Sequence, residues 1–351
     1  TYYDLGAVNV GTLVVGPDKN LWATIDTGVA KIPVGDPTTV TAYDITGFAA
    51  PGGIAVGPDK NLWAAGGDKM YRVTLANPAG ATPFGVPGMA AKQVAATASR
   101  VWVVDFNGKI HAFKTDGTFT TTTVGGNPQG IAGGPQDQVL YSNPENQTNH
   151  AARLTIGGTP QKTPLPGTDP SFSVAFGADG AYWVGLFLTR KIARITTDGN
   201  VTEYGTWPAP YLPRFVAAGP GATIWVSLED PGNDGAIGRV TGLDVDKTAT
   251  IKVKGATATV AKGRAAVRLK CPTAEVSGPC TGSVTLKSLT GKKAKLGKKT
   301  YSIRTGKTKA VKVALGGVTI GRNGLKVLAV VKVKDAAGNK KTVKKQIRLV
   351  R

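Results

Sequence analysis

The chain has 351 residues, enough for two domains that each bury a core. Its 47 Gly and 22 Pro favour short strands joined by turns, and it contains no run of about 18 apolar residues, which argues against a membrane-spanning helix. The net charge of +21 is unevenly placed: residues 246–351 hold 27 Lys and Arg against 3 acidic residues, whereas residues 1–245 hold 16 basic and 19 acidic residues.

A repeated segment organises the first two thirds of the chain. The nine residues Val-Gly-Pro-Asp-Lys-Asn-Leu-Trp-Ala occur unchanged at 15–23 and at 56–64. Alternating apolar residues on both sides of Gly-Pro-Asp predict two strands joined by a tight turn. The aromatic residue of the second strand recurs at a period typical of four-stranded propeller blades, about 40 residues. These six marker residues, which we expect to be buried between blades, are Trp22, Trp63, Trp102, Tyr141, Trp183 and Trp225.

The fourth strand of each unit decides how the ring closes. Fourth strands are predicted at 39–45, 81–86, 118–124, 160–165 and 201–206, but the sixth unit ends after its third strand, at 236–241. The segment Thr1-Tyr2-Tyr3-Asp4-Leu5 matches the fourth strand Thr41-Ala42-Tyr43-Asp44-Ile45. We therefore predict an all-β chain with a six-bladed β-propeller over residues 1–245, which residues 1–5 close by completing the sixth blade. Donation of this strand to a neighbouring molecule, which would build a filament, is the alternative.

The pattern changes near Thr248, where apolar residues begin to alternate with Lys, Thr or Arg. This alternation predicts half-buried antiparallel strands at 265–269, 283–286, 301–304, 310–314, 325–333 and 342–350, and hence a basic β-sandwich of about seven strands over residues 246–351. Cys271 and Cys280 are the only cysteines, and we expect a disulfide between them, because a metal site would need further ligands nearby. The disulfide and a first residue, Thr1, without a targeting segment favour a mature secreted protein.

Two resemblances add to this interpretation. The units Gly53-Ile54-Ala55-Val56-Gly57-Pro58-Asp59-Lys60-Asn61-Leu62-Trp63 and Arg190-Lys191-Ile192-Ala193-Arg194-Ile195-Thr196-Thr197-Asp198-Gly199 resemble repeats of the virginiamycin B (streptogramin) lyase family, over residues 1–245. The resemblance implies a seven-bladed enzyme that holds Mg²⁺ and uses channel histidines and a glutamate to open a cyclic ester by elimination. The segments Leu269-Lys270-Cys271-Pro272 and Asp335-Ala336-Ala337-Gly338-Asn339 resemble an immunoglobulin-like module of secreted proteins from high-GC Gram-positive bacteria.

The sequence departs from the lyase pattern at the residues that carry the chemistry. His111 and His150 are the only histidines, and each lies in a predicted third strand, roughly 10 Å outward from the channel-lining strand. The first strands begin instead with Gly52, Lys92, Gln129, Phe172 and Arg214. We therefore predict no catalytic residue, cofactor or metal site. A lyase or hydrolase that acts at the channel mouth, through Asp105, Glu229 and Arg214, remains the alternative.

The leading hypothesis is a non-enzymatic secreted or cell-surface protein of a bacterium, in which a propeller is presented on a basic sandwich for adhesion or extracellular assembly as a homo-oligomer or filament. A further alternative is binding of an acidic polymer or cell-wall component by a lysine cluster of the C-terminal domain. That cluster consists of Lys292, Lys293, Lys295, Lys298 and Lys299. Because no aromatic residues are interspersed among these lysines, sequence-specific nucleic-acid recognition is not expected. Alternatively, the same lysines only blunt sheet edges and keep the domain soluble.

Overall fold

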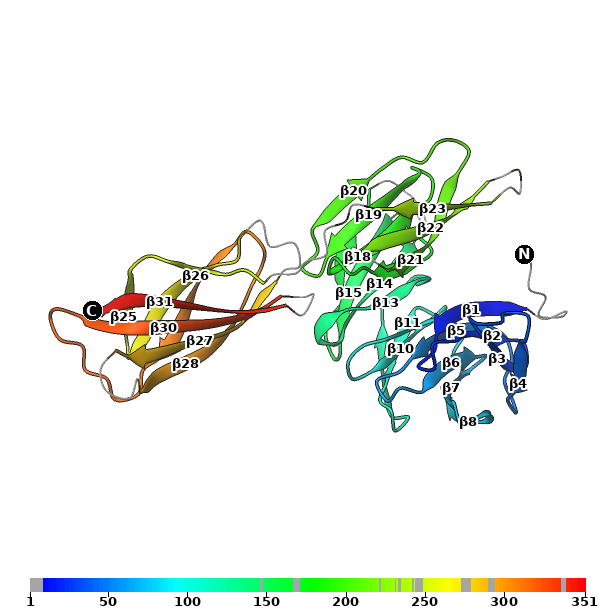
Figure 1. The fold of residues 1–351 in the computed structure, drawn as a ribbon, viewed down its shortest axis with the longest axis horizontal. Coiled ribbons are helices and arrows are strands. Elements are labelled where there is room, and N and C mark those ends of the chain that lie inside the picture. The colour runs from blue at the N-terminus through cyan, green and yellow to red at the C-terminus, as the bar shows by residue number, and fades with distance from the viewer. Residues whose placement is uncertain are drawn as a thin grey trace.

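The structure is a computed structural model in which a fan of four-stranded sheets lies beside a separate C-terminal β domain (Figure 1). It describes residues 9–145, 148–166, 171–220, 222–230, 232, 235–241, 243, 249–272, 279–289, 294–335 and 339–351. Residues 1–5 lie outside this set, so the closure of the ring by the N-terminal strand stays a prediction.

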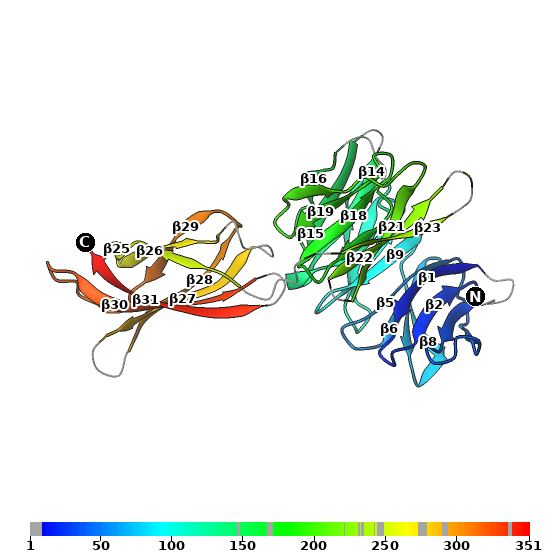
Figure 2. The ribbon, with the colours of Figure 1, turned by 45° about the horizontal axis from the view of Figure 1, so that its top comes forward.

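Six antiparallel sheets form the blades, and their strands follow one another from the channel outward (Figures 1 and 2). Blade 1 consists of β1 (Val10–Val15), β2 (Leu21–Ile25), β3 (Gly28–Ile32) and β4 (Thr41–Asp44). Blade 2 consists of β5 (Pro51–Val56), β6 (Leu62–Gly66), β7 (Lys69–Thr74) and β8 (Asn77–Gly85). Blade 3 consists of β9 (Ala91–Ala96), β10 (Val101–Asp105), β11 (Lys109–Phe113) and β12 (Phe119–Thr123).

The remaining blades follow the same order. Blade 4 consists of β13 (Ile131–Gly133), β14 (Gln138–Glu145), β15 (Thr148–Thr155) and β16 (Gln161–Pro164), with the short 3-10 helix η1 (Pro135–Asp137) before β14. Blade 5 consists of β17 (Val174–Phe176), β18 (Ala181–Leu186), β19 (Lys191–Thr196) and β20 (Val201–Tyr204). Blade 6 has three strands among the described residues: β21 (Leu212–Gly219), β22 (Thr223–Glu229) and β23 (Ala236–Val240). The six-bladed all-β arrangement predicted from the repeat is confirmed.

The repeated Gly-Pro-Asp turn is held by the marker tryptophan that follows it. In blade 1, Asp18 accepts the indole N–H of Trp22 at 3.0 Å and pairs with Lys31, which lies opposite Trp22 in β3. Burial raises the pKa of Asp18, but hydrogen bonds from Asn20, Trp22 and Lys31 lower it more, so the carboxyl stays ionised well below its usual range. The same arrangement recurs as Asp59 with Trp63 and Arg72, and as Asp179 with Trp183 and Arg194.

Five of the six markers are buried between blades, as predicted, and one is not. Each first strand packs against the next one, from β1 through β5, β9, β13 and β17 to β21. Trp22, Trp63, Trp102, Tyr141 and Trp183 are at most 1% exposed, whereas Trp225 of blade 6 is 38% exposed. The expectation that Trp225 is fully buried is therefore wrong. No further blade covers it among the described residues, and blades 1 and 6 lie at the two ends of the arc (Figure 2).

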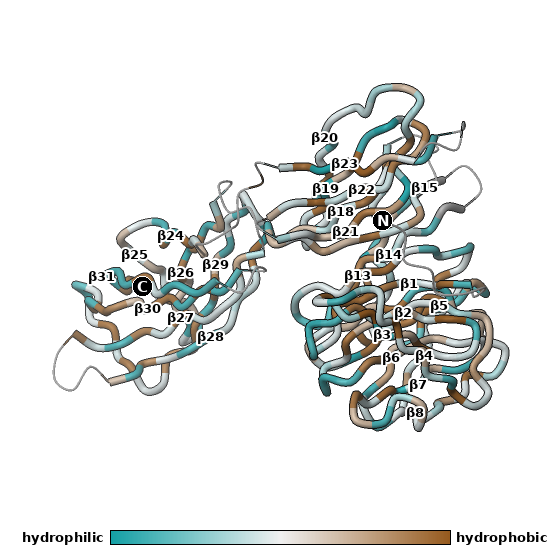
Figure 3. Tube along the Cα trace, turned by 45° about the vertical axis from the view of Figure 1, so that its right-hand side comes forward, coloured by the Kyte–Doolittle hydropathy of each residue, from teal (hydrophilic) through white to brown (hydrophobic). Residues whose placement is uncertain are grey.

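The C-terminal domain is an eight-stranded curled sheet around its own apolar core, and hydrophilic and hydrophobic residues alternate along its strands (Figure 3). Its strands are β24 (Lys252–Lys254), β25 (Thr257–Ala261), β26 (Arg264–Lys270), β27 (Cys280–Ser288), β28 (Lys295–Ile303), β29 (Thr308–Ala314), β30 (Leu325–Lys334) and β31 (Lys340–Val350). The last six correspond to predicted strands. Strand β25 pairs antiparallel with β26 and parallel with β31, and so joins the two layers of the curl. The immunoglobulin-like type and the domain boundaries stay predictions.

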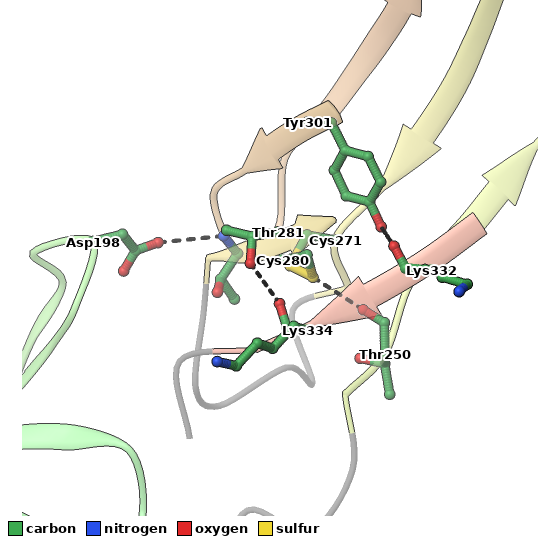
Figure 4. Close-up of a disulfide and its surroundings, with 9 residues drawn as sticks. Asp198, Thr250, Cys271, Cys280, Thr281, Tyr301, Lys332 and Lys334 are labelled. Carbon is green, nitrogen blue, oxygen red and sulfur yellow. Dashed lines mark hydrogen bonds between the residues drawn. A yellow bond between two sulfur atoms is a disulfide. The ribbon is translucent and has the colours of Figure 1, made fainter. Parts of the chain in front are cut away.

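The predicted disulfide between Cys271 and Cys280 is confirmed (Figure 4). Both cysteines are fully buried and belong to the core of the C-terminal domain. Close to this bridge the two parts of the chain touch, because the carboxylate of Asp198, in the turn between β19 and β20, accepts the Thr305 backbone N–H at 3.3 Å. This contact places the end of blade 5 against the basic domain.

Candidate functional site at the channel mouth

The six first strands line a common central channel. A hollow of about 500 Å³ is bounded by residues of β1, β5, β9, β13, β21 and the segment that begins β17. Its lining consists of Gly11, Thr12, Leu13, Ile54, Gln93, Val94, Ile131, Ser173, Val174, Phe215, Val216 and Ala217. None of these side chains titrates, so the described lining of this hollow offers no acid, base or cation.

Two of the polar side chains in this lining are used to hold neighbouring blades together. Thr12 Oγ1 accepts the backbone N–H of Ile54 at 3.0 Å, which joins blade 1 to blade 2. Ser173 Oγ accepts the backbone N–H of Val216 at 2.7 Å, which joins blade 5 to blade 6. These hydroxyls therefore have a structural role in the ring.

Charged residues gather at the mouth of the channel, where the first strands begin. The Arg214 guanidinium lies 4.8 Å from the ring centre of Phe172 and forms an ion pair with Glu229. Lys92 Nζ lies 4.1 Å from the ring centre of Phe106. Burial lowers the pKa of Lys92, and the positive charge of Arg214 lowers it further. The two cations therefore interact electrostatically across the mouth. The mouth is thus a cationic and aromatic rim.

Asp105 belongs to a separate, buried group. Its carboxylate accepts the backbone N–H groups of Ala90 at 3.0 Å and Asn107 at 2.9 Å, and its other oxygen lies 3.1 Å from His111 Nε2. The second ring nitrogen of His111 lies 2.9 Å from the Thr121 hydroxyl. Asp105 is 1% and His111 2% exposed. A carboxylate with three donors and no exposure fixes the loops of blade 3 and cannot reach a substrate.

The pKa values of this pair agree with a structural role. Burial raises the pKa of Asp105, but its hydrogen bonds with Asn107, Ala90 and His111 lower it more, so the carboxyl lies below its usual value. Burial also lowers the pKa of His111, and the neighbouring Asp105 offsets this shift only in part. Near neutral pH we therefore expect a neutral imidazole beside a carboxylate.

The described residues do not fit the Mg²⁺ that the lyase resemblance implies. His150 is buried in β15, in the blade next to that of His111. No group of three or more His, Cys, Asp and Glu side chains is placed to hold a metal ion in the part of the chain that the structure describes. Glu229, at the mouth, is paired with Arg214 rather than turned toward other oxygen ligands. We therefore derive no step that requires a metal.

The lysine cluster predicted in the C-terminal domain is only partly within the described residues. Lys295, Lys298 and Lys299 lie in β28 and are exposed, whereas Lys292 and Lys293 lie outside the described set. The structure brings Lys298 and Lys299 near Arg264 and Lys312, which the sequence analysis did not single out. The only signal for these two was their alternation with apolar residues in strands.

Comparison with known proteins confirms the lyase-like type of the propeller. Residues 90–259 match the profile of the Virginiamycin B lyase family. A virginiamycin B lyase of Nocardia farcinica is 35% identical over 111 residues, which are 31% of this chain and 38% of the lyase. The matched segment therefore spans well under half of that relative.

Solved structures support the fold. A catalytically inactive virginiamycin B lyase from Staphylococcus aureus with quinupristin superposes with a TM-score of 0.58 at 22% identity, over 67% of this chain and 81% of that one. The extracellular domain of a one-component system protein from B. thetaiotaomicron gives a TM-score of 0.52 at 11% identity, over 97% of this chain and 49% of that one. At these identities the likeness concerns the fold alone. Among the described residues, no helix is long and apolar enough to cross a membrane.

Proposed function

We propose that the chain is a non-enzymatic secreted or cell-surface protein, in which a lyase-like propeller is presented on a basic domain for adhesion or extracellular assembly. The main support for this proposal is that each candidate catalytic residue already forms an ion pair or hydrogen bonds within the chain. Glu229 and Arg214 pair with each other, and the Asp105 carboxylate is buried and takes part in three hydrogen bonds. A lyase at this mouth would need a free base, and the alternative of catalysis through these residues is correspondingly weaker.

An extracellular location is supported by two observations. The chain carries a buried disulfide, which persists in oxidising compartments. The solved structures of similar fold include extracellular domains of bacterial sensor proteins.

The uncovered side of blade 6 supports assembly. Phe215, Trp225 and Ile237 come from its three strands, lie on one face through the β21–β22–β23 register, and are 45%, 38% and 70% exposed. The Arg239 guanidinium lies 5.5 Å from the centre of the Trp225 ring. Each other blade buries the equivalent face under its neighbour, so this apolar face is suited to a second copy of the chain.

This assembly is tested by measuring the particle mass of the full chain over a wide concentration range. We expect the wild type to exceed the mass of a monomer, because association buries Trp225 and Ile237. Ile237→Lys should shift the particles to monomers without lowering the melting temperature, since Ile237 is exposed in the single chain. Leu188→Lys is the matched control, because Leu188 is 58% exposed on blade 5, outside this face. This variant should assemble as the wild type does.

Two results would count against a role for this face. One is a wild type that stays monomeric at every concentration. The other is assembly that survives Ile237→Lys but disappears when residues 1–5 are deleted, which would assign the contact to the N-terminal strand instead.

A second candidate function is binding of an acidic polymer by the C-terminal domain. It is favoured by a difference between the cations of the two parts of the chain, which is whether they have carboxylate partners. In the propeller, Lys31, Arg72, Lys191, Arg194 and Arg214 each have a carboxylate partner. No such ion pair occurs in the C-terminal domain among the residues that the structure describes. Of the three acidic residues of this domain, only Asp335 lies within the described residues, and its side chain is 1% exposed.

A further inference from the structure

The C-terminal domain carries a groove lined by unpaired cations. Two hollows, of about 640 and 510 Å³, adjoin at Arg264 and Lys312, which line both of them, and together they are called the groove below. It runs over the outer face of β25, β26 and β29 and enters the space between β28 and β29. The cations that line it, all exposed, are Lys262, Arg264, Lys298, Lys299, Lys309 and Lys312.

The groove lies where β28 and β29 run beside each other without forming a ladder. Strand β28 pairs with β27, and β29 pairs with β26. The two strands approach closely at Gly297, where an added Cβ would clash with the Ala314 carbonyl oxygen, and the neighbouring Leu296 carbonyl accepts the Gly316 backbone N–H. Beyond this contact the strands leave a hollow whose lining includes the buried residues Tyr301 and Val311. Gly297 is therefore required for the close approach that shapes the groove.

The pairing of β26 with β29 arranges the outer cations in a row. Arg264 lies opposite Ala314, Lys312 opposite Ala266, and Arg268 opposite Ala310. Residues two apart on a strand face the same side and are about 7 Å apart. The Cα atoms of Arg264, Lys312 and Arg268 thus follow one another at steps of about 7 Å along the strand direction, alternating between β26 and β29. Arg268 continues the row just beyond the residues that line the two hollows. Small alanines lie opposite each of them and leave room for a chain to lie flat.

No carboxylate that the structure describes neutralises this row. None of the groove cations forms an ion pair with a described carboxylate, and Asp335, the one acidic side chain described in this domain, is buried. A dense set of unpaired cations raises the local potential and attracts polyanions, which release bound counterions when they dock. The groove also offers no exposed aromatic ring for stacking of bases, because Tyr301 is 7% exposed and its hydroxyl donates to the Lys332 carbonyl.

We propose that this groove and the row beside it bind a linear, non-aromatic polyanion, a polymer that carries phosphate or carboxylate groups along its length, through Arg264, Lys312 and Arg268. Lys298, Lys299 and Lys309 extend the positive surface into the hollow between β28 and β29. The inference deepens the second candidate function, and it rests on that function for the statement that the basic domain holds acidic polymers.

The test uses the full chain and long-chain inorganic polyphosphate, with a carboxylate polymer, polygalacturonate, as the second probe. The groove variant combines Arg264→Gln, Arg268→Gln and Lys312→Gln. The control variant removes three charges from the exposed outer face of β30 and β31, through Lys326→Gln, Lys344→Gln and Arg348→Gln. All six side chains are exposed, so both variants should melt as the wild type does.

At low salt we expect the groove variant to bind polyphosphate at least tenfold more weakly, and the slope of log affinity against log salt to fall by about 2, because three contacts are lost. The control variant should lose less than about threefold. Binding of polyphosphate alone would indicate recognition of phosphate, whereas binding of both polymers would indicate recognition of anions in general. Either result supports the groove.

Three outcomes would contradict different statements. Equal losses of affinity in the two variants would show that the polymer binds a diffuse basic surface and not the groove, and the second candidate function would still stand. Failure of the wild-type chain to bind either polymer would remove that function itself. Tighter binding of single-stranded DNA than of polyphosphate at equal charge would contradict the non-aromatic assignment.

Discussion

Trp63→Ala is expected to lower the free energy of unfolding of the propeller by about 3–5 kcal/mol. Trp63 is fully buried, its indole donates to Asp59, and its ring stacks on Phe84 with ring centres 5.4 Å apart. Removing the ring leaves a cavity between two blades and an unpaired acceptor at the turn. Urea unfolding followed by far-ultraviolet circular dichroism measures the loss.

Trp225→Ala is the matched control, because Trp225 has the same place in its blade and is 38% exposed. Its ring makes no hydrogen bond to a turn aspartate, since Gly219-Pro220 is not followed by an Asp in the position of Asp59. We expect a loss of less than about half that of Trp63→Ala. Both losses are measured in the Ile237→Lys background, which keeps the chain monomeric. Equal losses there would show that blade 6 of the single chain is covered as fully as the other blades, which contradicts the open face described above.

Replacing both cysteines, as Cys271→Ser with Cys280→Ser, is expected to destabilise the C-terminal domain by about 2–3 kcal/mol, because the bridge restrains a short loop of the unfolded chain. The two residues are 9 apart and belong to the core of that domain alone. Differential scanning calorimetry should show a lower transition for the C-terminal domain and an unchanged transition for the propeller.

The wild type under reducing conditions is the control for this change, because it should reproduce the result of the double variant. A shift of the propeller transition, or no shift of either transition, would show that the bridge does not stabilise the C-terminal domain independently.

The strands of the propeller could be predicted because each repeat is recognisable from residues that are close together in the sequence. The period of the aromatic residues, the Gly-Pro-Asp turn and the alternation of apolar residues act within a few residues of one another. By contrast, the two short strands β24 and β25 were missed. Strand β25 pairs in parallel with β31, about 90 residues further along the chain, and no local pattern indicates that partner.

The exposure of Trp225 illustrates a different limit. It follows a Gly-Pro turn and lies in an apolar strand like Trp22 and Trp63, although its turn lacks the Asp. Its burial depends on whether another blade lies against it. That is a property of the curvature of the whole ring. The role of Asp105 was hidden in a similar way, because its partners Ala90 and His111 meet it only once β9, β10 and β11 pair.

The cationic groove could be predicted only in part. The lysines of 292–299 are close in sequence and were identified as a cluster, but Arg264 and Lys312 are 48 residues apart and meet through the β26–β29 ladder. Composition showed that the domain is basic. Only the register showed which cations form a row.

The central proposal, that this lyase-like propeller has no lyase activity, is tested most directly by ring opening of a streptogramin B depsipeptide by the purified full chain, with and without added Mg²⁺. We expect no linear product above the buffer control, because Glu229 is paired with Arg214 and the Asp105 carboxylate is buried among its donors. Metal-dependent turnover that disappears in Glu229→Ala or in Asp105→Ala would contradict it.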